Sequence, residues 1–152
     1  MIILFFTAIF FCAVAGFIAL IDKRRWRSTS VIGFIALDLA LVAELIGQVY
    51  SMWDFIGNEN WLFISLSNAA VYTLSACLFI QWYPFGNSKG RRFAYWLAWT
   101  TYAAALECLY LWAGHMVYLE NWSFGLSYGA DWFLFWIYYQ TYRTLRLERL
   151  NG

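Results

Sequence analysis

The stretch IILFFTAIFFCAVAGFIALIDKRRWRSTS, residues 2–30, decides the fold class of this chain. Its first part is an apolar run from Ile2 to Ile21, and a cluster of basic residues follows directly. A run of about 20 apolar residues is long enough for a helix to cross the hydrocarbon core of a bilayer. A cleaved signal peptide would carry its basic residues before a shorter apolar run. The order found here predicts a retained membrane helix that enters from outside.

The rest of the chain repeats this alternation of apolar runs and basic clusters. All ten Lys and Arg residues lie within residues 23–27, 89–92 and 143–149. Short loops that stay in the cytoplasm collect Lys and Arg, so the three clusters indicate one side of the membrane. We predict one all-α domain over residues 1–152, a transmembrane bundle of five helices with its N-terminus outside and its C-terminus inside. The helices are expected near residues 2–21, 31–52, 61–83, 93–114 and 125–142.

The composition excludes a soluble domain and argues against a nucleic-acid partner. The chain is 63% hydrophobic and only 12% charged, whereas a soluble surface is roughly 25–35% charged residues. The basic residues are interpreted as topology signals that also touch anionic lipid. The cysteines Cys12, Cys77 and Cys108 lie in apolar runs and are predicted to be small core residues. Aromatic residues are expected as a belt at the membrane interface: Trp53, Trp61, Trp82, Tyr83, Tyr118 and Trp122.

Four carboxylates lie inside the predicted crossings with no basic residue near them. Glu44, Glu107 and Asp131 fall in the outer half of the bilayer, and Asp38 lies about 120° around the second helix from Glu44. A carboxylate facing lipid costs at least about 2.5 kcal/mol, so such groups turn inward, pair or lose their charge. We therefore predict that Glu44, Glu107 and Asp131 converge in one sheltered hollow. At least one of them is expected to be protonated at neutral pH unless a cation is bound.

Small and polar residues at helical spacing accompany these acids. They include Ala36, Ala40 and Gly47 on the second helix and Ser75 on the third. Small residues let membrane helices approach closely, and polar side chains hydrogen-bond between helices. The candidate catalytic residues are Glu107, Glu44 and Asp131. The expected ligand-binding set is Glu44, Glu107, Asp131, Asn68, Gln48 and Tyr72.

No metal site is predicted, and the sequence does not identify a cofactor. His115 lies with Asp54, Glu59 and Glu120 in the predicted outer loops, but a single His without a helical partner is weak support for a metal centre. The chain carries no phosphate-binding loop, nucleophile elbow or cysteine pair. Function must therefore be argued from the carboxylates.

Three functions fit this arrangement. The first is a small polytopic inner-membrane protein whose carboxylate pocket binds a cation, a proton or a small amine-bearing ligand, with a link to transport. The second is an intramembrane enzyme that uses a protonated carboxylic acid on a lipid-soluble, polyprenyl-type substrate. In it, Tyr110, Trp112, Trp132 and Trp136 would stabilise a carbocation. The third is a structural subunit of a membrane complex, whose acids only hold helices together.

The segment 82–147 resembles an uncharacterised family of small multi-span membrane proteins of spore-forming Gram-positive bacteria. The resemblance rests on Pro84, Trp99, Leu106, Glu107, Gly114, Tyr118, Trp122 and Ser127. It implies a multi-pass protein of the bacterial cytoplasmic membrane and a preference for Glu at position 107, and it brings no activity with it. Because five helices are few for a transporter acting alone, the expected partners are the lipid bilayer and a homo-oligomer or larger membrane complex.

Overall fold

The computed structural model of the chain describes residues 2–56 and 61–151. Within these ranges five long α-helices account for most of the residues, together with two short strands and a terminal 3₁₀ helix. In chain order the elements are α1 (Ile2–Leu20), α2 (Trp26–Val49), β1 (Trp53–Phe55), α3 (Trp61–Gln81), α4 (Lys89–Trp112), β2 (Met116–Tyr118), α5 (Phe124–Thr144) and η2 (Leu147–Asn151).

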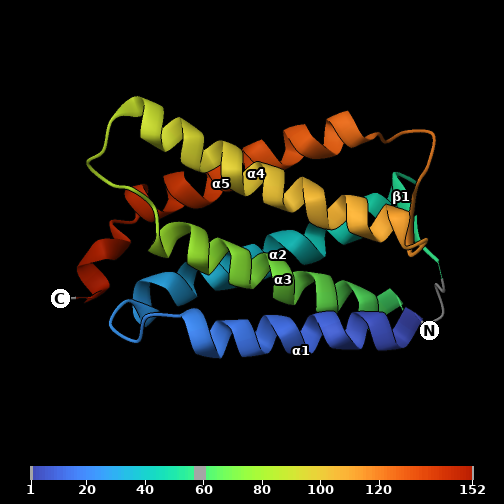
Figure 1. The fold of residues 1–152 in the computed structure, drawn as a ribbon, viewed down its shortest axis with the longest axis horizontal. Helices are drawn as coiled ribbons and strands as arrows, with labels where there is room; N and C mark the ends of the chain where they lie inside the picture. The colour runs from blue at the N-terminus through green and yellow to red at the C-terminus, as the bar shows by residue number, and fades with distance from the viewer. Residues whose placement is uncertain (1, 57–60, 152) are drawn as a thin grey trace.

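The long helices lie roughly side by side, with their connections gathered at two opposite ends (Figure 1). One end, called here the strand end, carries β1 and β2. The other, called the basic end, carries residues 21–25, 82–88 and 145–151. All three basic clusters of the sequence lie in or beside these segments. The positive charge of the chain is therefore concentrated at one end of the bundle.

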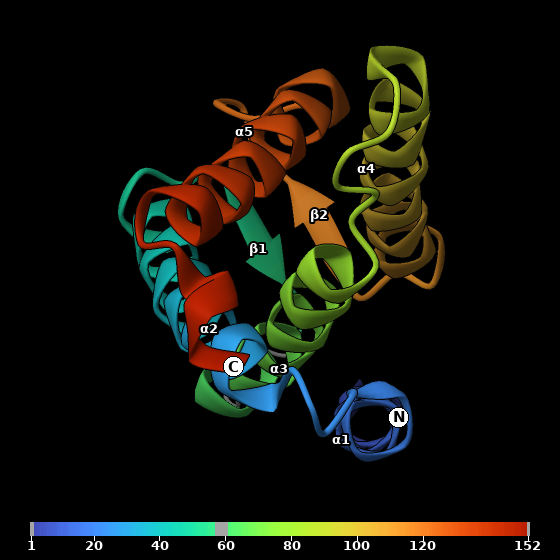
Figure 2. The ribbon, with the colours of Figure 1, turned by 90° about the vertical axis from the view of Figure 1, so that its left-hand side faces the viewer.

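Helix α1 lies outside the group formed by the other four long helices (Figure 2). It packs mainly against α3, whereas α2 contacts both α3 and α5. Seen from the basic end, α2, α3, α4 and α5 surround the strands, which lie across the far end (Figure 2). The strand pair therefore lies across one end of the four-helix group.

Two helices begin earlier than the apolar pattern predicts. Helix α2 begins at Trp26 rather than near residue 31, and the hydroxyls of Ser28 and Thr29 donate to the carbonyl of Arg25 at 3.0 Å. Helix α4 begins at Lys89 rather than near residue 93, because the Ser88 side chain caps it. The extent of an apolar run predicts only the segment of a helix that can lie in lipid, not the whole helix. The helical backbone continues into polar residues on the basic side.

At the other ends, α2 and α3 are shorter than expected. Helix α2 ends at Val49 rather than near residue 52, and Ser51 adopts a left-handed conformation with φ of 49°. Helix α3 ends at Gln81, before Pro84, because proline lacks the N–H that a continuing helix needs.

The predicted outer loops contain an antiparallel strand pair that the sequence does not indicate. Trp53 lies opposite Tyr118, and Phe55 lies opposite Met116. Each strand has three residues, too few for the alternation of apolar and polar residues to be recognised. The described part of the first loop ends at residue 56, so Glu59 lies outside the described residues.

The buried core forms two clusters. Toward the basic end, Phe79, Phe135 and Tyr138 lie at the centre of the larger one. Toward the strand end, Phe6 and Tyr110 belong to the smaller one. Cys77 is part of the core, but Cys12 and Cys108 are exposed, so the prediction that all three cysteines are core residues is wrong for two of them. An apolar helix of a membrane protein can place such residues toward lipid.

Among the described residues, three helices are long and apolar enough to cross a membrane: α1, α2 and α3. Helices α4 and α5 match α2 and α3 in length, at 24 and 21 residues, but they are rich in Trp and Tyr. The polar N–H and O–H groups of Trp and Tyr lower the mean hydropathy of both helices. These amphipathic rings favour the membrane interface more than its centre. By length and composition, three of the described helices thus suit a membrane.

Candidate functional site: a carboxylate-lined cavity

A cavity of about 290 Å³ lies between helices α2, α3, α4 and α5, on the side of β1 and β2. Its volume is near the lower end of the roughly 300–1,000 Å³ typical of small-molecule sites. The wall is mainly apolar and aromatic, and helix α1 contributes none of it. Its polar or titratable lining residues are Glu44, Trp53, Asn68, Tyr72, Ser75, Tyr102, Glu107, Tyr110, Trp122, Ser127 and Asp131.

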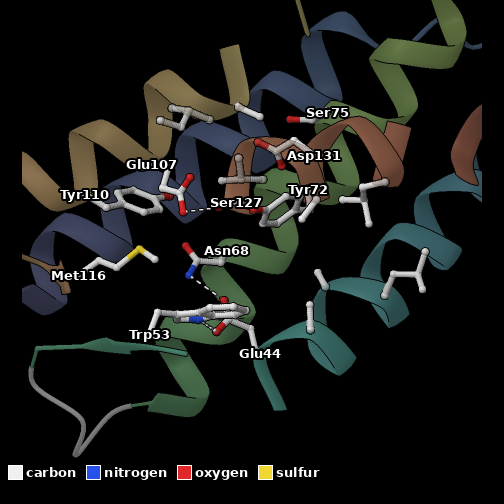
Figure 3. Close-up of a pocket in the computed structure, with 18 of the residues that line it drawn as sticks. Glu44, Trp53, Asn68, Tyr72, Ser75, Glu107, Tyr110, Met116, Ser127 and Asp131 are labelled. Carbon is white, nitrogen blue, oxygen red and sulfur yellow. Dashed lines mark hydrogen bonds between the residues drawn. The ribbon is translucent and has the colours of Figure 1, made fainter. Parts of the chain in front are cut away.

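Three carboxylates reach this cavity from three different helices. Glu44 lies on α2, Glu107 on α4 and Asp131 on α5. Figure 3 shows their carboxyl groups directed into the same space. Glu44 and Asp131 each keep only 7% of their surface exposed, so both groups have exchanged bulk water for the protein interior. The predicted convergence of these acids is therefore found in the structure.

Glu44 is held by donors on both of its carboxyl oxygens. The Trp53 indole N–H donates to Oε2 at 3.2 Å, and the Asn68 amide donates to Oε1 at 3.3 Å (Figure 3). Trp53 can reach Glu44 because the chain turns back after α2, so that β1 passes beside that helix. Two donors on a buried carboxylate stabilise its position and its charge.

Glu107 is held from α5 and lies beside β2. The Ser127 hydroxyl donates to its Oε1 at 2.5 Å and so links α4 to α5. Tyr118, on β2, brings its hydroxyl close to the Glu107 carboxyl. Burial, together with the nearby Glu107 carboxyl, raises the pKa of the Tyr118 phenol. Tyr118 therefore stays protonated and is a donor available on the Glu107 side of the site.

Asp131 lines the cavity from α5, together with Tyr72 and Ser75 of α3 (Figure 3). No hydrogen bond to Asp131 is found in the described part of the chain, although the group is almost fully buried. Tyr72 keeps 37% of its surface uncovered while lining the cavity wall. The carboxyl oxygens of Asp131 therefore remain open to water or a ligand in the cavity.

The cavity wall has many acceptors and little positive charge. Among its described lining residues there is no Lys, Arg or His. The Oδ1 atom of Asn68 is buried without a donor, which adds a neutral acceptor to the three carboxyl groups. On the donor side, the indole N–H of Trp122 is buried without an acceptor. The site therefore suits a ligand that brings N–H donors and positive charge.

Five of the six predicted binding residues line the cavity: Glu44, Glu107, Asp131, Asn68 and Tyr72. Gln48 is exposed on α2 and does not line the cavity. On the same stretch of α2 it is Gly47 that lies against Trp53, a residue of the cavity wall. Asp38 is exposed on α2 and does not line the cavity, in agreement with its predicted separation from Glu44.

Trp53 and Trp122 are site residues that the sequence analysis did not assign to the cavity. Both were expected in an interfacial belt, but both line the cavity, with their ring centroids 5.2 Å apart. Tyr83 is also buried, and of the expected belt only Trp61 and Trp82 are exposed, by 47% and 50% of their surface. A tryptophan at the end of a membrane helix can face either the interface or the protein. The sequence carries no signal that separates these two positions.

The aromatic residues named for carbocation chemistry are dispersed. Tyr110 lines the cavity. Trp132 instead borders a separate groove near the basic end, and Trp112 and Trp136 are exposed. The aromatic set of the enzyme hypothesis therefore does not assemble around the carboxylates.

The outer polar residues do not form a metal centre in the part of the chain that is described. No group of three or more His, Cys, Asp or Glu side chains there is placed to hold a metal ion. His115 is buried beside Phe5, with ring centroids 4.4 Å apart, and Glu120 is exposed. The only histidine thus packs as an aromatic residue in the strand-end core.

Comparisons with protein-family models, with curated proteins and with solved structures found no match to this chain. Function is therefore argued from the cavity itself.

Proposed function

We propose that this chain is a five-span protein of the bacterial cytoplasmic membrane whose cavity binds a small organic cation with an amine group. The observation that carries the proposal is the convergence of Glu44, Glu107 and Asp131 on one cavity without a basic lining residue. Carboxylates inside a membrane are expensive, and groups kept there usually serve an ion, a proton or a ligand. An ammonium group would supply the missing positive charge and several donors at once.

The chemistry of the wall supports an organic cation over a bare metal ion. The described carboxylates come from three helices and are not grouped as metal ligands. Trp53, Tyr72 and Tyr110 contribute aromatic rings to the same wall. Rings of this kind attract ammonium groups through cation–π contacts, by about 0.5–2 kcal/mol each. The apolar remainder of the wall would hold the carbon skeleton of the ligand.

The arrangement of the helices supports five crossings with the N-terminus outside. Helices α4 and α5 lie beside α2 and α3, which are long and apolar enough to cross. At about 1.5 Å per residue, 24 and 21 residues give roughly 36 and 32 Å, enough for the hydrocarbon core. A cytoplasmic basic end follows from the distribution of Lys and Arg. The cavity would then lie in the outer half of the membrane.

Two observations favour binding over the other functions. A structural subunit would need only satisfied acids, but Asp131 has no hydrogen-bond partner in the described chain and borders open space. A polyprenyl-type substrate would need a long apolar channel, whereas the cavity measures about 290 Å³. A role in transport would require a homo-oligomer or a larger membrane complex, because five helices are few for a transporter acting alone.

Calorimetric titration of the purified protein with butylammonium chloride tests the proposal. We expect butylammonium to bind and butanol, its uncharged counterpart, not to bind. Glu107→Gln and Asp131→Asn should each weaken binding about ten-fold or more, because each removes a charged acceptor worth roughly 1.5–3 kcal/mol. Binding of both compounds with equal affinity would contradict a carboxylate-based site.

Asp38→Asn is the matched control. It removes a carboxylate from the same helix as Glu44, but on an exposed face away from the cavity. We expect butylammonium to bind this variant as tightly as the unmodified protein. If Asp38→Asn weakened binding as much as Asp131→Asn, the effect would reflect overall charge, and the cavity would not be the site.

A further inference from the structure

A second hollow, a groove of about 310 Å³, lies toward the basic end between the start of α4 and the facing side of α5. Lys89 and Arg92 of α4 supply its charge. Trp96, Trp132 and Tyr139 form aromatic walls, with the Trp96 and Trp132 ring centroids 5.9 Å apart. None of the described Asp or Glu residues lines this groove. The charged residues that line this groove are thus opposite in sign to those that line the carboxylate cavity.

Two donors in this groove lack acceptors. The Nε atom of Arg92 and the Nε1 atom of Trp96 are both buried and have no hydrogen-bond partner among the described residues. Both groups can only donate. A buried donor without an acceptor costs about 1–3 kcal/mol, and more when it is charged. An acceptor-rich, negatively charged group bound in the groove would satisfy donors of this kind.

The position of the basic residues on α4 strengthens this requirement. Lys89, Arg91 and Arg92 all lie at the N-terminus of the helix, and the first turn carries no acidic residue. This end of a helix bears a partial positive charge, so cations there are unfavourable and anions are favourable. Arg91 is bonded to Asn87 at 2.8 Å. Lys89 and Arg92 line the groove. Neither of their side chains has a hydrogen bond like that of Arg91 to Asn87 in the described part of the chain.

A third cation lies beside the aromatic wall. Arg143 of α5 donates to the Tyr139 hydroxyl at 3.2 Å and stacks over its ring at 5.7 Å from the centroid. Tyr139 in turn lines the groove. Positive charge therefore approaches the groove from both α4 and α5.

We propose that this groove binds a phosphate group, supplied by the headgroup of an anionic phospholipid. Phosphate offers only acceptor oxygens, which match Arg92 Nε, Trp96 Nε1 and the Lys89 ammonium. The aromatic walls suit the glycerol and upper acyl carbons that follow the phosphate. The groove lies at the basic end, where headgroups of the cytoplasmic leaflet attract Lys and Arg. The site is independent of the ligand proposed for the carboxylate cavity.

Lipid retention measured by native mass spectrometry tests this site. The full-length protein in detergent is mixed with phosphatidylglycerol or phosphatidylcholine, and bound lipid is counted. We expect phosphatidylglycerol to be retained in preference, because the choline cation of the other lipid is repelled by Lys89 and Arg143. Arg92→Gln should reduce the retained phosphatidylglycerol about ten-fold, the loss of one charged hydrogen bond.

Arg91→Gln is the matched control, since it removes the same charge from the same turn outside the groove. It should retain phosphatidylglycerol as the unmodified protein does. Trp96→Phe keeps the ring but removes the N–H, and it should weaken retention without a change of charge. Equal losses for Arg91→Gln and Arg92→Gln would overturn the site in favour of diffuse surface attraction.

Inorganic phosphate separates a lipid from a soluble source. We expect phosphate to raise the melting temperature of the lipid-free protein weakly at most, compared with chloride at equal ionic strength. Strong stabilisation by phosphate that Arg92→Gln removes, with no preference for phosphatidylglycerol, would overturn the assignment to lipid.

Discussion

Glu44 shows how much of the site depends on one neighbouring side chain. Its carboxyl accepts from Trp53, which lies over the α2 residue Gly47. A Cβ atom at Gly47 would overlap the indole ring of Trp53. The absence of a side chain at position 47 is therefore what lets Trp53 enter the cavity wall.

Gly47→Ala should consequently displace Trp53 and break its bond to Glu44. Overpacking of this kind costs about 1–3 kcal/mol, so we expect the free energy of unfolding in mixed micelles to fall by that amount. Butylammonium binding should change as well, because Trp53 lines the cavity.

Gly129→Ala is the control for this substitution. Gly129 lies within α5, and a Cβ atom there meets nothing within 4 Å. Removing a helical glycine stabilises by up to about 1 kcal/mol when no clash follows. If both substitutions lowered stability equally, close packing of Trp53 on Gly47 would not be the cause.

The acids could be located from the sequence because their cost in lipid restricts them. Glu44, Glu107 and Asp131 had to turn inward, and helical periodicity then placed them at similar depths. Gln48 and Trp53 carry no such restriction, since an amide or an indole is tolerated at a membrane interface. Which of the two faced the cavity depended on the path of the chain after α2.

At the level of helices and connections, Gln81 joins the end of α3 to the segment between α1 and α2. Its Oε1 accepts from the backbone N–H of Asp22 at 2.8 Å, and its Nε2 donates to the carbonyl of Leu20 at 2.9 Å. The Gln81 carbonyl also accepts from Arg25 at 2.8 Å. One residue therefore satisfies backbone groups that the end of α1 leaves unpaired.

Gln81→Leu keeps the size of this side chain but removes its hydrogen bonds. The backbone groups of Leu20 and Asp22 would lose their partners, so we expect a loss of about 1–3 kcal/mol in unfolding free energy. Amide exchange should increase locally at residues 20–25. Gln140→Leu, on the exposed face of α5, should change neither quantity, and an equal loss there would point to a general effect of the substitution.

The helices themselves could be predicted from the sequence, but their ends could not. Apolar runs locate the middle of each helix, since only a helix satisfies its backbone inside lipid. Ser88 and Ser123, which cap α4 and α5, were a usable signal for the starts of these helices. The β1–β2 pair joins segments far apart in the chain, and no local pattern encodes such a pairing.

At the scale of the whole molecule, the separation of charge leads to a test of orientation. In a chain whose three cysteines are replaced by alanine, Gly90→Cys places a thiol at the basic end and Glu120→Cys places one at the strand end. A membrane-impermeant maleimide applied to intact bacterial cells should label Glu120→Cys only. Gly90→Cys should react after lysis, and the cysteine-free parent should never react.

This labelling also tests whether α4 crosses the membrane. Residues 90 and 120 lie on either side of most of α4. Labelling of both in intact cells would place them on one side and contradict the crossing. Labelling of Gly90→Cys alone would reverse the orientation and move the carboxylate cavity to the inner half of the membrane.

The sequence by itself determined that the chain is helical, that it suits a membrane, and that Glu44, Glu107 and Asp131 face inward. These follow from solvation, because lipid penalises unpaired backbone and uncompensated charge wherever they occur along the chain. Only the tertiary structure decided that Trp53 and Trp122 complete the cavity, that Gln48 does not, and that Lys89 and Arg92 face an aromatic groove. Those outcomes depend on how distant segments pack, which no single segment specifies.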